Sequence, residues 1–313
     1  MQNIAVIFHP SKISLEKIQA AFKKAGFPEL DFYPTDSATS GLATTKAAIN
    51  SGANHIIVAG GDGTVRACVQ AVFEEEAQVT LGLVPIGTGN ILARNLKLPI
   101  TNLDKCIRRA VTGDGYEIDL GVAKAIDLHG DLIKLYFTGI AGIGMDARIM
   151  QRTQPELKKR VGWIAYIEGG FRSLPLKFEK FEVLVDDLTL KSLKSYSILI
   201  GNAGWLPGQI SMMPDARLDD GKLDVAAIGP RKIWNWVDFF ARVTWQNKVV
   251  RPLALGRKWM DQTANLKTIE NLGGSRIRVK PHHPSPLQLD GDVIGEVLEV
   301  DFSLQHKALR IRL

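Results

Sequence analysis

The chain has 313 residues and a net charge of +6, with a sequence isoelectric point near 9.2. Its 45% of hydrophobic and 23% of charged residues argue against long disordered segments, and the length favours two domains over one. No run approaches the roughly 18 uninterrupted apolar residues of a membrane helix, and the apolar start is too short for an export signal, so we expect a cytoplasmic protein. Charge alone does not choose among nucleic acid, an anionic membrane and a phosphorylated substrate.

Short apolar runs alternate with helical patterns from the amino terminus to about Tyr116. Strands are predicted at 4–8, 55–59 and 81–85, and helices at 15–25, 43–51, 65–75 and 103–111. This alternation predicts an α/β domain with a parallel, doubly wound sheet and helices on both faces. Ligands of such sheets bind at the carboxyl ends of the strands.

The pattern changes after Asp119, where β-rich runs are separated by turn residues. These runs lie at 132–138, 181–185, 195–200, 223–228 and 276–279, and helical patterns interrupt them at 145–174 and 233–249. Such a succession predicts an all-β sandwich with helical insertions. We therefore divide the chain into an α/β domain at 1–117 and a sandwich domain at 118–296.

A glycine-rich turn follows the strand at 55–59 and precedes the helix at 65–75. It reads Gly60-Gly61-Asp62-Gly63-Thr64. Its glycines let backbone amides approach a phosphate chain, and the helix amino terminus favours negative charge. Asp62 would reach a phosphate-bound magnesium ion, because a hard cation prefers oxygen ligands. Taken alone, the segment is more typical of a tight turn in which Asp62 caps the helix.

The same arrangement recurs one unit later, where the strand at 81–85 leads into Ile86-Gly87-Thr88-Gly89-Asn90. Two such turns on adjacent units lie at the same edge of the sheet, which favours a phosphate-binding function over two coincidental turns. Neither turn has the lysine of a P-loop, and the dinucleotide spacing GxGxxG is absent.

Five motifs together resemble the diacylglycerol kinase-like lipid kinases of bacteria, and the resemblance runs nearly end to end. They are GGDGT, PIGTGN, AGIGMDA at 141–147, PDARLDDGKLDV at 214–225 and LDGD at 289–292. The resemblance implies an amino-terminal domain like those of phosphofructokinase and NAD kinase, followed by a β-sandwich. It also implies that the last strand, 297–313, returns to the first domain.

The resemblance further implies an enzyme that binds ATP and Mg²⁺ and phosphorylates a lipid hydroxyl. It assigns nucleotide binding to Thr35, Gly60, Gly61, Asp62, Gly63, Thr64, Val65, Arg66, Ala67, Gly87, Thr88 and Asn90. The segment 35–41 can also be aligned with Ser37 or Thr39 at the first of these positions, so three hydroxyls are candidates for it.

A second metal site is implied in the loop at 217–222. There the resemblance gives a structural magnesium ion the carboxylate of Asp220 and the main-chain carbonyls of Arg217 and Lys222. Oxygen donors at turn-like spacing suit a hard cation. Without the resemblance, Asp219-Asp220-Gly221 is typical of an acidic β-turn that binds no ion.

The segment Asp290-Gly291-Asp292 bears on mechanism, because phosphoryl transfer needs an acceptor hydroxyl that loses its proton as it attacks. We predict Asp292 as the general base, with Asp62 as the second catalytic residue. The family usually has Glu where this chain has Asp292, which is one methylene shorter. A misplacement of roughly an ångström can cost about 10²-fold in rate. The alternative is an acidic hairpin turn.

A lipid kinase without a membrane span must visit the bilayer surface. The segment 231–249 combines Trp234 and Trp236 with flanking cations, which is typical of an interfacial helix and also of a core helix. The cluster Lys158-Lys159-Arg160 would attract anionic lipid or form a solvated helix face. We expect a membrane lipid as substrate, transient binding to the anionic inner face of the cell membrane and no nucleic acid. A homodimer is left open.

Diacylglycerol, converted to phosphatidic acid, is the acceptor we expect first. Sphingosine, ceramide and phosphatidylglycerol are alternative lipid acceptors. A kinase for NAD or a sugar phosphate shares GGDG-type turns, but the motifs at 214–225 and 289–292 favour lipid. A protein that senses nucleotide or lipid without turnover remains a further alternative, because Asp292 departs from the family pattern.

Overall fold

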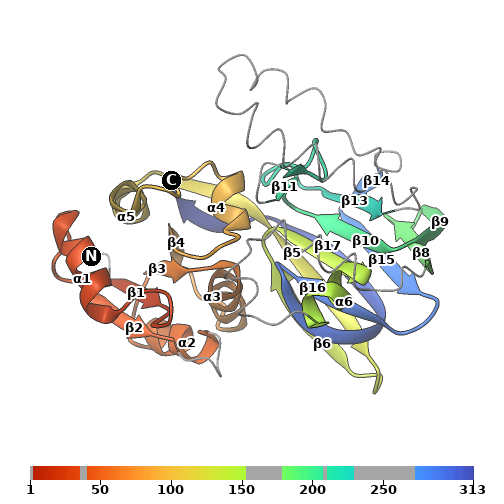
Figure 1. The fold of residues 1–313 in the computed structure, drawn as a ribbon, viewed down its shortest axis with the longest axis horizontal. Helices are drawn as coiled ribbons and strands as arrows, with labels where there is room; N and C mark the ends of the chain where they lie inside the picture. The colour runs from red at the N-terminus through yellow and green to blue at the C-terminus, as the bar shows by residue number, and fades with distance from the viewer. Residues whose placement is uncertain (1–2, 36–40, 153–177, 207–209, 229–271) are drawn as a thin grey trace, which may run out of the picture.

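The computed structural model describes residues 3–35, 41–152, 178–206, 210–228 and 272–313. Ser37, Thr39, most of the predicted helical segment at 145–174, the cluster at 158–160 and the predicted segment at 231–249 lie outside these ranges. Figure 1 shows an α/β group at the amino-terminal end and a β-rich group beside it.

The α/β group is built on a parallel sheet with the strand order β2-β1-β3-β4. Its strands are β1 (Ile4–Phe8), β2 (Asp31–Pro34), β3 (His55–Gly60) and β4 (Thr80–Pro85). Its helices are α1 (Leu15–Lys24), α2 (Leu42–Asn50), α3 (Asp62–Glu74), α4 (Ile91–Asn95) and α5 (Leu103–Thr112).

Alternate residues of the strands face opposite helical layers. Ile57 of β3 packs with residues of α1 and α5, whereas its neighbours Ile56 and Val58 pack with residues of α2 and α3. Successive side chains of a strand point to opposite faces, so a strand between two helical layers is apolar throughout. The predicted doubly wound sheet is therefore confirmed.

Helix α3 begins at Asp62, three residues before the predicted start at Val65. The amide of Val65 already donates to Gly61 O at 3.0 Å, so the glycine turn itself forms the first turn of the helix. Strand β2 was not predicted, because its four residues include an exposed Asp31 and end at Pro34, both untypical of a strand interior.

The β-rich group consists of two sheets packed face to face. One has the strand order β14-β13-β10-β7-β16, the other contains β9, β8, β15, β17, β5 and β6, and the pairing of β16 with the first residues of β17 makes the two continuous. The strands are β5 (Gly115–Asp127), β6 (Leu132–Phe137), β7 (Ile140–Gly144), β8 (Glu179–Val185), β9 (Thr189–Ser195), β10 (Ser197–Gly201), β13 (Leu223–Ile228), β14 (Leu272–Gly274), β15 (Arg276–Pro281), β16 (Ser285–Leu289) and β17 (Asp292–Arg312).

Apolar side chains from both sheets fill the space between them, and Phe137, Phe181 and Phe302 are fully buried there. This is the predicted all-β sandwich. The predicted strand at 195–200 corresponds to β10, which begins at Ser197. Ser195 is the last residue of β9. Helix α6 (Met145–Arg152) follows β7, and the two-residue strands β11 (Trp205–Leu206) and β12 (Ile210–Ser211) pair with each other.

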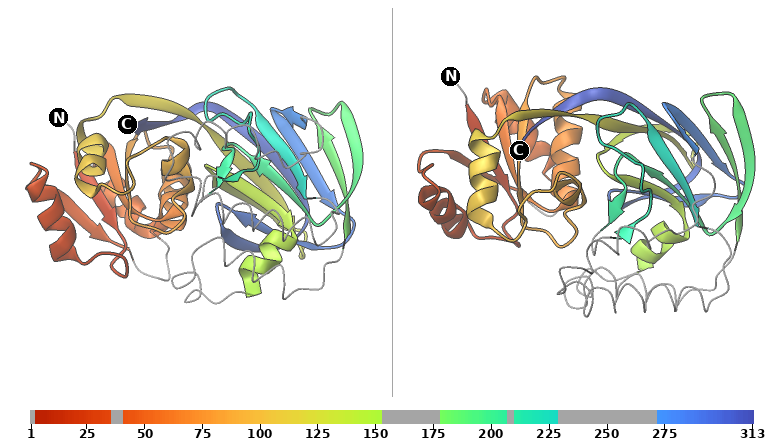
Figure 2. Two further views of the ribbon diagram at one scale, coloured as in Figure 1. Left: turned by 45° about the horizontal axis from the view of Figure 1, so that its top comes forward. Right: turned by 90° about the horizontal axis from the view of Figure 1, so that it is seen from above.

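Two long strands run from one group into the other, as Figure 2 shows. Strand β17 pairs antiparallel with β5 along most of its length, and its residues 310–312 pair in parallel with 80–82 of β4. Residues 117 and 118 lie within β5, so the chain passes between the groups inside a strand rather than through a linker. This pairing fixes where the first residues of β17 lie relative to the α/β sheet.

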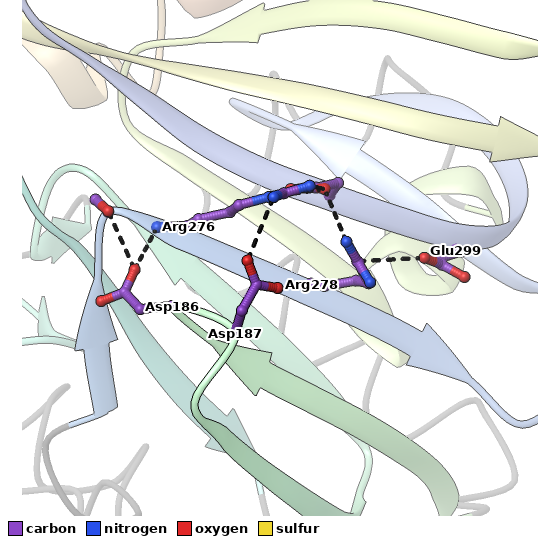
Figure 3. Close-up of polar contacts among 7 residues, drawn as sticks. Asp186, Asp187, Arg276, Arg278 and Glu299 are labelled. Carbon is purple, nitrogen blue, oxygen red and sulfur yellow. Dashed lines mark hydrogen bonds and ion pairs between the residues drawn. The ribbon is translucent and has the colours of Figure 1, made fainter.

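A network of ion pairs joins the β8–β9 turn to β15 and β17 (Figure 3). Arg276 donates to both carboxylate oxygens of Asp301 and lies 3.4 Å from Asp187. Asp186 accepts from the backbone amide of Arg276 at 2.9 Å, and Arg278 lies 3.5 Å from Glu299. The network thus ties the middle of β17 to its neighbours.

Within the described part of the chain, no helix is both long and apolar enough to cross a membrane.

Candidate active site

The two glycine turns touch each other through their backbones. A Cβ atom on Gly87 would lie 2.5 Å from the Cα of Gly61, which no side chain tolerates. The amide of Ile86 donates to Gly60 O at 3.0 Å, and β3 and β4 are adjacent, with Gly60 opposite Pro85. The structure therefore brings together the two turns that the sequence places at one edge of the sheet.

Asp62 joins one turn to the other. Its carboxylate accepts hydrogen bonds from the amides of Asn90, at 2.7 Å, and Ile91, at 2.5 Å, at the start of α4. The residue that precedes α3 is Gly61, so the alternative in which Asp62 caps its own helix is wrong; its carboxylate instead binds the first amides of α4. Burial, and then the nearby charge of Asp290, raise the pKa of Asp62 to about 6.

The second turn is also closed by its own side chain. Asn90 adopts a left-handed backbone conformation with φ 50°, which asparagine tolerates better than most residues. Its Oδ1 accepts from the amide of Gly87 at 3.1 Å, and its Nδ2 donates to Gly87 O at 2.8 Å. These bonds leave Thr88 exposed at the tip of the turn.

The hairpin between β16 and β17 carries two aspartates that point to different places. Asp290, which is 5% exposed, accepts from the amides of Thr138, Gly139 and Ile140 at 2.8, 2.8 and 3.1 Å. Burial raises its pKa. Its carboxylate fixes the hairpin to the turn before β7, which is a structural role that the sequence did not reveal.

Asp292 points toward the first glycine turn. Its carboxylate lies 2.9 Å from the place that a Cβ on Gly63 would occupy. Its Oδ2 accepts from Arg66 of α3, at 3.1 Å from Nε and 3.0 Å from Nη2. The pair joins residues 226 positions apart in the chain, so the predicted base and the predicted phosphate turn lie in contact.

Other residues predicted to bind nucleotide lie near the first glycine turn and differ in how far they are buried. Gly60 lies against buried Thr64, and Ala67 is buried on α3. Thr35 lies at the carboxyl end of β2; the residue is 4% exposed, and its hydroxyl has no hydrogen-bond partner within the described part of the chain. A buried hydroxyl without a partner costs free energy, so a ligand atom would improve the site at Thr35.

The predicted metal loop at 217–222 is held by a buried acid of β5. Asp119 accepts from the amide of Gly221 at 2.7 Å and lies 2.8 Å from the ring of His306. Asp220 accepts from the amide of Lys222 at 3.1 Å. Burial, and then the charges of Asp220 and Asp215, raise the pKa of Asp224 to about 6.

The carboxylates of Asp215, Asp220 and Asp224 lie near one another at this loop, and a bound cation would offset their repulsion. In the described ranges, however, no three side chains of His, Cys, Asp or Glu gather at metal-binding spacing. An ion in this loop would therefore need main-chain oxygens beside Asp220, as the resemblance implies for Arg217 and Lys222. Asp119 could not be identified from the sequence, because its structural role depends on a contact with a residue 102 positions away.

A further acid that sequence reasoning missed is Asp146, in the motif at 141–147. It lies at the start of α6, where its Oδ2 accepts from Gln288 Nε2 at 3.2 Å. Gln288 Oε1 in turn accepts from the amide of Gly291 at 2.8 Å. A chain of hydrogen bonds thus links Asp146 to the hairpin that carries Asp292. Burial raises the pKa of Asp146 to about 6.

This pKa predicts how stability depends on pH. Folding raises the pKa of Asp146 from 3.8 to about 6, so the folded state binds more protons than the unfolded state between these values. The free energy of unfolding should therefore fall as pH rises from 4 to 6, by up to about 3 kcal/mol. Asp146→Asn keeps an acceptor for Gln288 and removes the charge.

We expect Asp146→Asn to unfold at a higher temperature than the wild type above pH 6, and the difference to shrink below pH 4. Thermal unfolding midpoints measured in steps from pH 4 to 8 check this. Midpoints of the two proteins that run parallel across the whole range would exclude a buried charge at Asp146.

The fold and the paired turns define a class: proteins in which an α/β sheet with two phosphate-suited glycine turns is joined to a β-sandwich. Residues 9–123 match the family model described as the diacylglycerol kinase catalytic domain. Residues 139–312 match the model described as the YegS C-terminal NAD kinase beta sandwich-like domain. The chain belongs to the diacylglycerol kinase family, and it is a lipid kinase of that type, a phosphotransferase with an alcohol group as acceptor.

Relatives cover much of the chain. A diacylglycerol kinase of Staphylococcus saprophyticus is 31% identical over 225 residues, 69% of each chain. One from Bacillus subtilis is 26% identical over 303 residues, 94% of this chain and 91% of the relative.

Two solved structures share the fold. A diacylglycerol kinase from Bacillus anthracis has a TM-score of 0.72 at 21% identity and covers 99% of this chain and 96% of its own. An NAD kinase from Archaeoglobus fulgidus in complex with ATP has a TM-score of 0.52 at 10% identity and covers 99% and 93%. At these identities the likeness concerns the fold alone.

Proposed function

We propose that the protein transfers the γ-phosphate of ATP to the hydroxyl of diacylglycerol and forms phosphatidic acid. The observation that carries this proposal is the contact between Asp292 of β17 and the first glycine turn at Gly63. It joins an acid from the sandwich to a phosphate-suited turn of the α/β sheet. Membership of the diacylglycerol kinase family supports a lipid acceptor.

The nucleotide phosphates would bind where the two turns meet. The first amides of α3 have no partner within their own helix, and they begin at the glycine turn. Because the helix dipole also favours negative charge at this end, phosphate oxygens would replace water there. The exposed Thr88 hydroxyl would add a donor from the second turn.

The transfer step conserves atoms and charge. The acceptor oxygen forms a bond to the γ-phosphorus while the bond from that phosphorus to the β–γ bridging oxygen breaks, and ADP leaves. The proton of the attacking hydroxyl passes to the carboxylate of Asp292 and later to water. The side chain of Asp292 is 43% exposed, so an acceptor arriving from outside can reach it.

Magnesium fits the charges of this site. Asp62 and Asp292 lie at the first glycine turn, and burial, followed by the charge of Asp290, raises the pKa of Asp62. A polyphosphate beside these carboxylates is unfavourable unless a cation offsets the repulsion, and carboxylate oxygens suit Mg²⁺. When bound, the ion would neutralise charge on the phosphate oxygens during transfer. Asp220 with the carbonyls of Arg217 and Lys222 would hold a second, structural ion.

Transfer of radiolabel from ATP to lipid tests the proposal. Mixed micelles would contain diacylglycerol, sphingosine, ceramide or phosphatidylglycerol in separate reactions, with NAD as a soluble control acceptor. Label in phosphatidic acid, lost on chelation of Mg²⁺ and regained on its return, is the expected result. Label in NAD alone would favour an NAD kinase, and nucleotide binding without any labelled product would favour a sensor.

Because diacylglycerol resides in the bilayer, the proposal includes transient binding of the protein to the inner face of the cell membrane. Its support is the composition of 231–249, where Trp and Phe lie beside Lys and Arg. Replacing Trp234 and Trp236 by Ser should lower co-sedimentation with anionic liposomes several-fold while the thermal unfolding midpoint stays unchanged. Equal co-sedimentation of variant and wild type would remove this segment from the membrane contact.

A further inference from the structure

An ion pair holds the proposed base against the phosphate turn. Arg66 donates to Asp292 Oδ2 from both Nε and Nη2, at 3.1 and 3.0 Å. The arginine side chain is 14% exposed, whereas that of Asp292 is 43% exposed. The guanidinium is therefore the enclosed, fixed partner, and the carboxylate is the partner that an acceptor can reach.

The helix places Arg66 where it can act on the turn. Residues three and four apart on a helix share one face, so Arg66 lies above Gly63 and Asp62. Both carboxylate oxygens of Asp292 lie within 3.2 Å of the place that a Cβ on Gly63 would occupy. Since both donors of Arg66 contact Oδ2, they leave Oδ1 available to accept from a hydroxyl.

The ion pair between Arg66 and Asp292 also bears on the shorter side chain of Asp292. Asp292 has one methylene fewer than the Glu that is usual in the family, so its carboxylate depends more on how the backbone and its partners hold it. Two donors of one planar guanidinium converge on Oδ2 and hold that oxygen in place, whereas a single ammonium group offers no such fixed pair of donors. Asp292 begins β17 in the sandwich, whereas Arg66 belongs to the α/β group.

We propose that Arg66 is a positioning residue, which holds Asp292 over Gly63 so that its carboxylate meets the acceptor hydroxyl at the γ-phosphate. This inference rests on the proposed function, because it assigns Arg66 a part in the same transfer step. Arg66 acts through Asp292, and its contribution therefore disappears once Asp292 can no longer accept a proton.

A double-mutant cycle on kcat tests this dependence. The four proteins are the wild type, Arg66→Gln, Asp292→Asn and the double variant. Arg66→Gln should lower kcat by about 10²-fold, because a carboxylate misplaced by roughly an ångström loses about that factor. Its KM for ATP and for lipid should stay within threefold. Arg66→Lys, which keeps the charge but not the double donation, should lose about 10-fold.

The double variant shows whether Arg66 acts through Asp292 or on the phosphate itself. If Arg66 acts through Asp292, the double variant should be no slower than Asp292→Asn alone. Multiplying losses would show that Arg66 acts on the phosphate itself and would overturn the inference, as would a folded Arg66→Gln with kcat within threefold of the wild type. A folded wild type that labels no lipid would instead overturn the proposed function, and the inference with it.

Lys46→Gln is the matched control. Lys46 pairs with Glu74 and Glu75 at the other end of α3, at 2.9 Å from each. The substitution removes the ion pairs that join Lys46 of α2 to the end of α3, and it does not alter the β16–β17 hairpin. The kcat should therefore stay at the wild-type value. Thermal unfolding midpoints of all variants separate a loss of folding from a loss of positioning.

Discussion

Asp292→Asn should lower the rate of phosphoryl transfer by about 10²- to 10⁴-fold, which is the usual contribution of a general base. The amide keeps the size of the side chain and an oxygen that can accept from Arg66, so the hairpin and the glycine turns should stay in place. Affinity for Mg²⁺ and nucleotide should change by less than about threefold. Single-turnover transfer and a nucleotide titration, each on folded protein, measure the two effects separately.

Asp292→Glu is the informative comparison, because it restores the carboxylate with the length that is usual in the family. It should retain transfer within about 10-fold of the wild type, whereas Asp292→Asn should not. If Asp292→Asn transferred phosphate at a near-normal rate, or if it lost nucleotide along with activity, Asp292 would not be the base.

Asp62→Ala should fail at an earlier stage, the binding of nucleotide. The change leaves the amides of Asn90 and Ile91 without their acceptor, and a hydrogen bond to a charged group contributes roughly 1.5–3 kcal/mol. The second glycine turn should then lose its position against the first. We expect nucleotide affinity to fall by more than about 10²-fold and the thermal unfolding midpoint to drop.

The raised pKa of Asp62 adds a pH dependence to this prediction. Because that pKa is about 6, the carboxylate becomes protonated as pH falls through 6, and affinity for Mg²⁺ and nucleotide should fall with it. In Asp62→Ala this dependence should be absent. The matched control is Asp104→Ala, which removes an exposed acid from the first turn of α5, where it pairs with Arg108. Nucleotide affinity unchanged in Asp62→Ala would show that the turns do not need this link.

The sequence predicts the scaffold of the site well, because its signals are local. Apolar runs that end in glycine turns identify β3 and β4, and parallel strands place both turns at one edge. The contact between Gly61 and Gly87 follows directly from that adjacency. Both layers of helices and the β-sandwich were predicted from periodicity for the same reason.

The connections within the site could not be predicted, because they join distant parts of the chain. Asp62 binds amides 28 and 29 residues later, and Arg66 binds an acid 226 residues later. Which aspartate of the β16–β17 hairpin points inward depends on the backbone at Asp290 and Gly291, with φ of 50° and 89°. The resemblance identifies Asp292 as the candidate base, but the structural role of Asp290 is seen only in the folded hairpin.

In the proposed function, the paired glycine turns and Asp292 form one site for transfer to lipid. The most direct measurement compares ATP labelled at the γ-phosphate with ATP labelled at the α-phosphate, in micelles of diacylglycerol with Mg²⁺. We predict that γ-label appears in extracted phosphatidic acid with the wild type and nearly vanishes with Asp292→Asn, while α-label stays in the aqueous phase. Lipid that remains unlabelled, from folded wild-type protein that binds the nucleotide, would contradict the account.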